Sequence, residues 1–253
     1  MVKYRIYPSL LDAYADYRNA SEIWETYWGS SDHPSKTLEQ YCDEQFQNVI
    51  DRINRVPFES EAADRGTALN NLVDYCAAGK GAPIFHTWVK DDVNLGFAVE
   101  QNGHTFYFPH AMVDELVKYF YGNLAQTFVK GKISTKYGEV ELYGFVDYIS
   151  RDCVHDLKTT SRYSEGKYAD HWQWVVYPYC LSQMGCLIKN FEYNVVEIGK
   201  SSWKTYTETY IVQETDIVRL IGFVEDFIKF LETNRDKITD KKIFNEERLW
   251  LTR

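Results

Sequence analysis

Cysteine is scarce in this 253-residue chain, and the few that occur form no paired pattern. The five cysteines are odd in number, and no two of them have Cys-x-x-Cys spacing; they are Cys42, Cys76, Cys153, Cys180 and Cys186. Disulfide-stabilised secreted domains and zinc knuckles depend on paired cysteines. The sequence therefore predicts neither a disulfide framework nor a zinc knuckle.

Two further absences limit where the protein acts and how it meets its partners. No uninterrupted apolar run approaches the length needed to cross a membrane, and residues 1–5 contain no apolar signal region. We therefore expect a cytoplasmic protein with no membrane partner. The net charge of −9 counts against an overall electrostatic attraction to nucleic acid, although an enzyme with a cleft needs only local positive charge.

Aromatic side chains, by contrast, are abundant at 16% of residues, with 20 tyrosines and 7 tryptophans. Together with the chain length they predict a packed globular protein, a single domain over residues 1–253 with a helical extension at about 1–58. Within the extension, apolar residues recur near a period of 3.6 at 9–17 and 37–56, which predicts two amphipathic helices.

Helical and strand patterns alternate in the rest of the chain. Helices are predicted over 60–76, 111–124, 171–179 and from Thr215 onward. Strands are predicted over 84–89, 95–99, 105–108, 128–135, 140–148, 154–160, 191–198 and 205–212. This order predicts an α/β fold with a central mixed β-sheet flanked by helices.

A pair of carboxylates is predicted to meet in a hairpin formed by residues 143–148 and 154–160, which a polar turn separates. Side chains alternate faces along a strand, so Asp156 and Lys158 point the same way. Asp147 lies near the turn end of the partner strand, which brings its carboxylate close to Asp156. Two crowded carboxylates favour a cation between them, and oxygen ligands suit Mg²⁺ or Mn²⁺.

Asp147 followed by Asp156-Leu157-Lys158 resembles the signature of the PD-(D/E)xK nuclease superfamily. The resemblance implies that Asp147, Asp156 and the backbone carbonyl of Leu157 bind the metal ion. It also implies that Lys158 orients or deprotonates the attacking water and offsets charge on the phosphate.

A second pair of motifs narrows the resemblance. Gly144-x-x-Asp147 together with Gln173-x-x-x-Tyr177 is similar to the RecB-like and lambda-exonuclease-like branch of the superfamily. Gln173 and Tyr177 are four residues apart, hence on one helix face, and the resemblance places them beside the site, in contact with the substrate. Pro178 is expected to kink or break this helix just past Tyr177.

An upstream segment resembles the first motif of the same family, Gly-Thr-x-x-His-x-x-x-Glu. Here it is Gly66-Thr67-x-x-Asn70-x-x-x-Asp74. Asn70 and Asp74 share a helix face, and the resemblance implies that both reach the metal. An amide oxygen is a weaker ligand than a carboxylate, so Asp74 is the stronger candidate of the two.

Basic residues on either side of these motifs are candidates to contact backbone phosphates. Arg162 and Lys167 follow the Asp-Leu-Lys strand directly, and Lys130, Lys132 and Lys136 precede it.

The resemblance implies a restriction-endonuclease-like fold and a Mg²⁺- or Mn²⁺-dependent deoxyribonuclease, an exonuclease of phage-type recombination or repair. DNA is the implied substrate, a recombination or single-strand-annealing protein is a candidate partner, and the oligomeric state stays open. Two alternatives remain: a non-catalytic DNA-binding or scaffold protein on the same fold, and a structure-specific endonuclease. Some relatives bind an iron–sulfur cluster through one early and three late cysteines; no cysteine follows Cys186, so we expect no cluster.

Overall fold

The computed structural model describes residues 2–90, 93–200 and 202–245. Its elements in chain order are β1 (Val2–Ile6), α1 (Pro8–Arg18), α2 (Ala20–Trp28), α3 (Leu38–Ile53), α4 (Glu61–Ala78), β2 (Ile84–Lys90), β3 (Val93–Gln101), β4 (His104–Pro109), α5 (His110–Phe120), β5 (Leu124–Thr135), β6 (Gly138–Ile149), β7 (Cys153–Thr160), α6 (Gln173–Gln183), β8 (Asn190–Ile198), β9 (Trp203–Ile211), α7 (Glu214–Thr233) and the 3₁₀ helix η1 (Lys241–Phe244). Among these described segments, no helix is long and apolar enough to cross a membrane.

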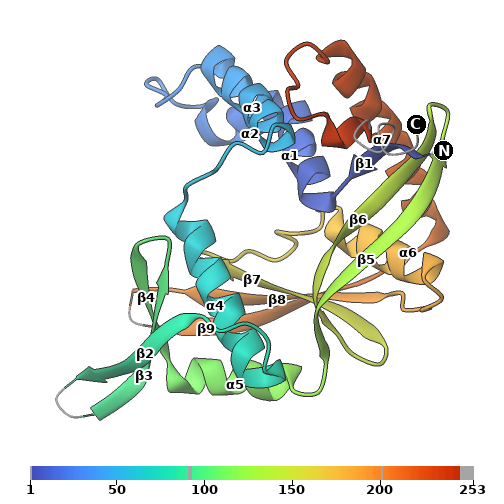
Figure 1. The fold of residues 1–253 in the computed structure, drawn as a ribbon. Helices are drawn as coiled ribbons and strands as arrows, with labels where there is room; N and C mark the ends of the chain where they lie inside the picture. Colours follow the sequence, from blue (N-terminus) through green and yellow to red (C-terminus); the bar gives the residue numbers. More distant parts are fainter. Residues whose placement is uncertain (1, 91–92, 201, 246–253) are drawn as a thin grey trace.

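A six-stranded sheet forms the centre of the molecule (Figure 1). Its strands follow the order β1-β6-β7-β8-β9, and β5 pairs with β6 as well. The β1–β6 and β7–β8 pairs are parallel, whereas β5–β6, β6–β7 and β8–β9 are antiparallel. The predicted α/β class, with a mixed central sheet flanked by helices, is therefore confirmed.

Strand β6 shares one of its edges between two partners. β5 pairs along the whole of the other edge. On the edge away from β5, β1 pairs with residues 139–142 of β6, and β7 pairs only at Tyr148 and Ile149. The stretch 143–147 lies between these two partners, at a fork in the sheet. The predicted hairpin is confirmed, and it puts Asp147 at the point where β6 and β7 diverge.

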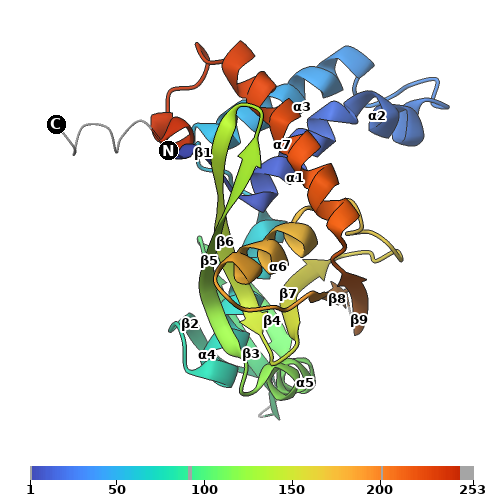
Figure 2. The ribbon, with the colours of Figure 1, turned by 90° about the vertical axis from the view of Figure 1, so that its right-hand side faces the viewer.

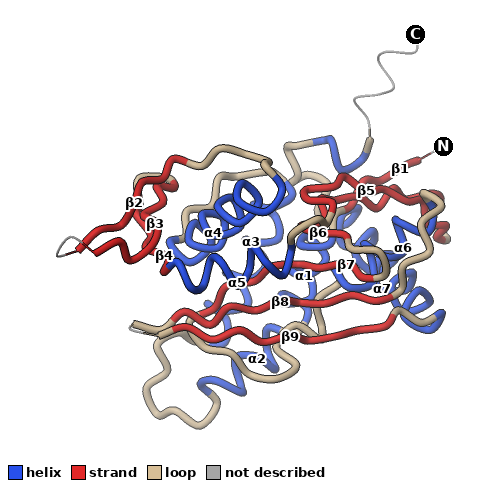
Figure 3. Tube along the Cα trace, turned by 90° about the horizontal axis from the view of Figure 1, so that it is seen from below, coloured by secondary structure: helices blue, strands red, loops and turns tan. Residues whose placement is uncertain are grey.

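Helices cover both faces of the sheet and enclose two hydrophobic cores. α1, α3, α6 and α7 pack around the larger core, and α4 and α5 around the smaller one. Figure 2 shows α6 and α7 beside β5 and β6, and Figure 3 shows α4 and α5 near the small antiparallel sheet β2-β3-β4. In the smaller core the rings of Phe120 and Tyr148 stack with centroids 4.0 Å apart.

The first residues differ from the expected helical extension because they begin with a strand. Tyr4 and Ile6 of β1 are buried and alternate with more exposed neighbours, the pattern of a half-buried strand. The helix that follows is tied to the last helix of the fold, since Tyr14 of α1 lies 5.0 Å from Phe227 of α7, centroid to centroid. The extension therefore forms part of the central sheet and of the larger core.

A break in α6 at Pro178 is not observed, and the helix continues to Gln183. Proline removes one backbone N–H, which would otherwise bond to the carbonyl of Trp174. Pro178 is buried in the larger core region, as are Tyr177, Cys180 and Leu181 around it. The burial of these apolar side chains offsets the loss of a single hydrogen bond.

Candidate active site at the fork in the sheet

Three of the predicted residues meet at the fork. Lys158 Nζ lies 2.6 Å from Asp156 Oδ2, which confirms that these two side chains share a face of β7. Asp147 lies close enough to Asp156 for the negative charge of one carboxylate to raise the pKa of the other. The fold thus brings two carboxylates and one ammonium group together.

Gln173 holds two members of this group in place. Its Nε2 donates a hydrogen bond of 2.8 Å to Asp156 Oδ1, and its Oε1 accepts one of 2.7 Å from Lys158 Nζ. Both ends of the amide are therefore used. Since Gln173 is buried at the start of α6, the helix fixes the orientation of the carboxylate and of the ammonium group.

The divergence of β6 and β7 exposes backbone groups that Asp147 partly satisfies. Its Oδ2 accepts a hydrogen bond of 2.9 Å from the backbone N–H of Leu157, in place of a strand partner. In a strand, the N–H and C=O of one residue point to the same side. The carbonyl oxygen of Leu157 therefore points into the gap that Asp147 occupies. A metal ligand at Leu157, as predicted from the sequence, requires this orientation.

The charges at the fork alter one another's protonation. Loss of hydration and then the charge of Asp156 raise the pKa of Asp147 to about 7. Burial alone would lower the pKa of Lys158, but Asp156 and Asp147 outweigh it and the pKa is raised. Lys158 is thus a cation at neutral pH in the metal-free protein.

Helix α4 approaches the fork because Gly66 faces β7. A Cβ atom at Gly66 would lie 3.1 Å from Thr159 Oγ1, directly after Lys158. One turn further, the Asn70 amide lies beside Asp147, and its Oδ1 is buried without a hydrogen-bond partner among the described residues. The Gly-Thr motif therefore brings Asn70 to the site.

Asp74 lies deeper than Asn70. It is buried beside the Tyr148 hydroxyl and Gln126, and loss of hydration raises its pKa. It does not line the cavity at the fork, whereas Asn70 does. The metal-binding role of Asp74 remains a prediction, and Asn70 is the nearer of the two to Asp147.

The motifs Gly144-x-x-Asp147 and Gln173-x-x-x-Tyr177 contact each other directly. A Cβ atom at Gly144 would lie 2.7 Å from Cε1 of Tyr177 and 3.2 Å from its hydroxyl. Glycine at this position therefore lets α6 lie close to β6. This contact places Gln173, one turn before Tyr177, within reach of Asp156.

Two site residues were missed by the sequence analysis. Gln126 lies opposite Asp147, between the β5–β6 pairs Ala125–Tyr148 and Thr127–Val146, has a φ of +46°, and donates a long hydrogen bond of 3.5 Å to Asp147 Oδ1. Such a backbone conformation is costly for a residue other than glycine and concentrates at functional sites. Asp12 of α1 accepts a 2.7 Å hydrogen bond from the backbone N–H of Trp172, and its charge acts on Lys158. Loss of hydration raises the pKa of Asp12 to about 7.

A cavity of about 490 Å³ opens over these groups. Its walls come from β6, β7 and the start of α4 and α6, and it is lined by Ala62, Ala63, Gly66, Thr67, Asn70, Phe145, Asp147, Asp156, Leu157, Lys158, Thr159 and Gln173. This volume is in the range of small-molecule sites. Phe145, which lines the cavity, is 59% exposed.

The predicted basic contacts lie outside this cavity. Arg162 and Lys167 are exposed on the loop after β7, where Lys167 Nζ donates to Thr160 Oγ1 and to the Arg162 carbonyl. Lys132 and Lys136 pair with Glu139 and Glu225. Phosphate contacts by these residues remain predictions.

The donor set at the fork fits a hard divalent cation. The carboxylates of Asp147 and Asp156, the Leu157 carbonyl and the unpartnered Asn70 Oδ1 are all oxygen atoms, which Mg²⁺ and Mn²⁺ prefer. Asp12, Asp147 and Asp156 all act electrostatically on Lys158, the one lysine among the described residues that line this cavity. A bound cation would balance this excess of negative charge.

The comparisons with known proteins do not identify the family. No protein-family model matches the chain, and no curated protein matches its sequence. Among solved structures, the crystal structure of SSO0001 is 18% identical to this chain over 48% of its length, with a TM-score of 0.35. The match spans 56% of that protein.

Asp147→Asn is expected to stabilise the metal-free protein at alkaline pH. The folded state binds more protons than the unfolded chain between about pH 4 and pH 7, because the pKa of Asp147 is raised, so stability falls as pH rises through this window. The amide removes this penalty, which at about 1.4 kcal/mol for each pH unit of the window amounts to about 4 kcal/mol at pH 8 and to none at pH 4. Thermal melts across this pH range measure it.

Asp152→Asn is the matched control, because this carboxylate is exposed at the turn of the same hairpin. It is expected to leave the melting temperature unchanged at both pH values. If the stability of Asp147→Asn varied with pH as strongly as that of the wild-type protein, carboxylate crowding at the fork would be disproved.

Proposed function

We propose that the protein is a metal-dependent nuclease of the PD-(D/E)xK type, with a restriction-endonuclease-like fold, that hydrolyses DNA phosphodiester bonds. One observation carries this proposal: Asp147 and Asp156 converge beside Lys158 at an open cavity. The sequence motifs predict the same juxtaposition. The oxygen donors and the excess negative charge support Mg²⁺ or Mn²⁺ as the cofactor.

Each side chain has a role in this proposal. The carboxylates of Asp147 and Asp156 and the Leu157 carbonyl would hold the cation, and Asn70 and Asp74 would complete or support its ligand set. When bound, the cation would activate water and neutralise charge on the phosphate. Lys158 enters the reaction as a cation, since its pKa is raised, and it would orient the water and offset developing negative charge. Gln173 positions Asp156 and Lys158.

Aromatic side chains at the edge of the cavity favour a substrate that carries nucleobases. Phe145 faces Phe128, with ring centroids 5.2 Å apart, and Phe128 lies 6.4 Å from Tyr143. The guanidinium of Arg5 lies 4.9 Å from the Tyr143 ring. This aromatic stripe (Phe145, Phe128 and Tyr143) offers stacking surfaces for unpaired bases, and the Arg5 guanidinium at its end is paired with Glu141 at 2.7 Å.

Asp156→Asn and Lys158→Met are each expected to lower kcat by about 100-fold or more, because each removes a charge that acts on the phosphate. Asp156→Asn is also expected to weaken Mg²⁺ binding, whereas Lys158→Met is expected to preserve it. Cleavage of a labelled DNA duplex and calorimetric Mg²⁺ titration measure the two effects. Asp114→Asn, exposed on α5, is the control.

Undiminished cleavage by purified Asp156→Asn protein would overturn the site. A wild-type protein that binds DNA but does not cleave it with saturating Mg²⁺ or Mn²⁺ would favour the alternative of a non-catalytic DNA-binding protein on the same fold.

Phe145→Ala is expected to weaken binding of a single-stranded oligonucleotide by about 1–3 kcal/mol, because a stacked base is lost. The measurement is made in the Asp156→Asn background, so that cleavage does not interfere. Tyr121→Ala removes an even more exposed aromatic ring, 76% exposed and outside this cavity, and should have no effect. Equal losses from the two substitutions would exclude a specific stacking role for Phe145.

We further propose that the enzyme is an exonuclease of phage-type recombination or repair. The chain carries a net charge of −9, so productive binding depends on few contacts near the cut. A linear duplex is therefore expected to be degraded much faster than a covalently closed circle of the same sequence. Equal rates on the two substrates would instead establish an endonuclease.

A further inference from the structure

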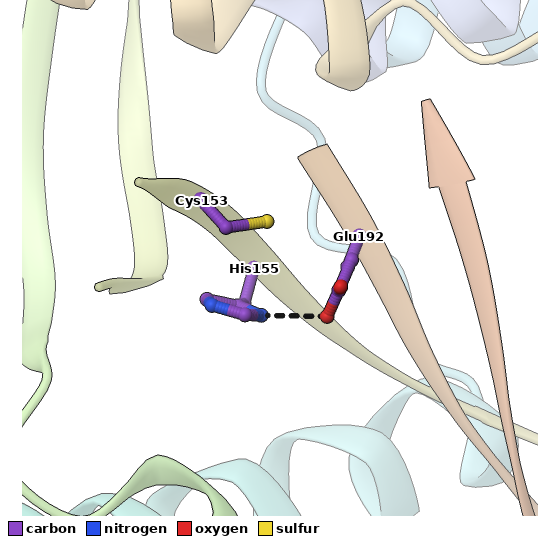
Figure 4. A group of neighbouring side chains, drawn as sticks. All are labelled: Cys153, His155 and Glu192. Carbon is purple, nitrogen blue, oxygen red and sulfur yellow. Dashed lines mark ion pairs between the residues drawn. The ribbon is translucent and has the colours of Figure 1, made fainter. Parts of the chain in front are cut away.

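A second polar cluster lies on the opposite face of β7 from Asp156. Cys153 and His155 are two residues apart on β7 and share that face. Glu192 on β8 is the strand partner of His155. The thiol, an imidazole nitrogen and a carboxylate oxygen of these three residues lie within 4.8 Å of one another (Figure 4).

Hydrogen bonds at the turn before β7 suit one tautomer of His155. The Ser150 hydroxyl donates to the Cys153 carbonyl at 3.1 Å and accepts from the Cys153 N–H at 3.2 Å. His155 Nε2 lies 3.1 Å from the same Ser150 oxygen. In the tautomer in which Nε2 carries the ring hydrogen, Nε2 donates to the Ser150 oxygen, whose own proton goes to the Cys153 carbonyl. The lone pair is therefore on Nδ1.

The lone pair of His155 Nδ1 faces a carboxylate. Nδ1 lies 3.2 Å from Glu192 Oε2, and the dashed line in Figure 4 marks this approach. The side chain of His155 is only 7% exposed, and among the described residues Nδ1 makes no well-oriented hydrogen bond. In the tautomer with the lone pair on Nδ1, these two electron-rich atoms repel each other, and a cation between them removes the repulsion.

We propose that Cys153, His155 and Glu192 bind a transition-metal ion of the zinc class. A thiolate with an imidazole selects such an ion over Mg²⁺, and three protein ligands leave a fourth position for water. In a tetrahedral site, neighbouring ligand atoms are about 3.5 Å apart. The three ligand atoms now lie within 4.8 Å of one another, so small side-chain rotations suffice to bring them to this distance. Binding displaces the Cys153 thiol proton to solvent and transfers no electron.

The surroundings match those of protein metal sites. Ligating histidines commonly donate their second ring nitrogen to a fixed acceptor, here the Ser150 oxygen, and ligating carboxylates are themselves hydrogen-bonded. The Tyr119 hydroxyl donates a 2.7 Å hydrogen bond to Glu192 Oε2. Tyr119 also lines a cavity of about 150 Å³, from which water can approach. The ion would join β7 to β8 directly behind Asp156 and Lys158.

Cobalt(II) provides the test, because a thiolate bound to cobalt gives an intense near-ultraviolet band that oxygen ligands do not produce. Metal-free full-length protein is titrated with Co²⁺ in excess Mg²⁺. One equivalent is expected to produce the band, and Zn²⁺ is expected to remove it. Cys153→Ser should lose the band. Cys180→Ser should retain it, since Cys180 is buried on α6 with its thiol against the Leu142 carbonyl.

Further variants separate this site from the nuclease site. Asp156→Asn should keep the band at full strength, so loss of cleavage does not affect the result. Glu192→Gln should weaken Co²⁺ binding, and Tyr119→Phe should weaken it about 10-fold through the lost hydrogen bond to Glu192. These two replacements also carry the test if Cys153→Ser fails to fold, which circular dichroism would reveal.

Two outcomes would overturn the proposal. One is the absence of a thiolate band from folded wild-type protein at saturating Co²⁺. The other is unchanged Co²⁺ affinity and band intensity in folded Cys153→Ser or Glu192→Gln protein.

Discussion

β6 and β7 separate after two residue pairs, and the organisation of the candidate site follows from this separation. Beyond it, the backbone groups of β7 that would have bonded to β6 need other partners, because unpaired buried backbone groups are costly. The Asp147 carboxylate supplies one of them by accepting the N–H of Leu157. The same side chain is thereby held opposite Asp156.

Helices α4 and α6 can pack close to the fork because a glycine lies at each contact. Gly144 leaves room for the Tyr177 ring, and Gly66 leaves room for Thr159. A β-carbon at Gly144 would have to displace the ring, since 2.7 Å is far below van der Waals contact. The glycines of these motifs are thus explained by packing. Because these contacts bring α6 and α4 close to the fork, they also position Gln173 and Asn70 at the site.

The charges at the fork are arranged at a cost in stability. Three carboxylates, those of Asp12, Asp147 and Asp156, act electrostatically on the ammonium group of Lys158, and burial and the charge of Asp156 raise the pKa of Asp147. A protein selected for stability alone would not keep such a group. Natural sites that bind cations tolerate this penalty because the cation repays it. The energetic argument therefore agrees with the geometric one.

Local rules of the sequence were enough to predict the mixed α/β sheet, the carboxylate hairpin and the shared face of Asp156 and Lys158. These features follow from strand alternation and turn chemistry, which involve neighbouring residues. The i, i+4 spacing likewise predicted that Gln173 and Tyr177 lie on one helix face. The strand β1 and the unbroken helix at Pro178 were not predicted, because burial against distant segments outweighed local preference.

Long-range contacts were decided only by the tertiary structure. Asp12 meets the start of α6 at Trp172, and Glu192 meets His155 through the parallel pairing of β7 with β8. Gln126 reaches Asp147 because the pairing of β5 with β6 sets the two residues opposite each other. No spacing rule links these residues, since their separation in sequence is set by the lengths of the intervening elements. Their proximity depends on how those elements pack, which is why the sequence identified the carboxylate–lysine group but not its neighbours.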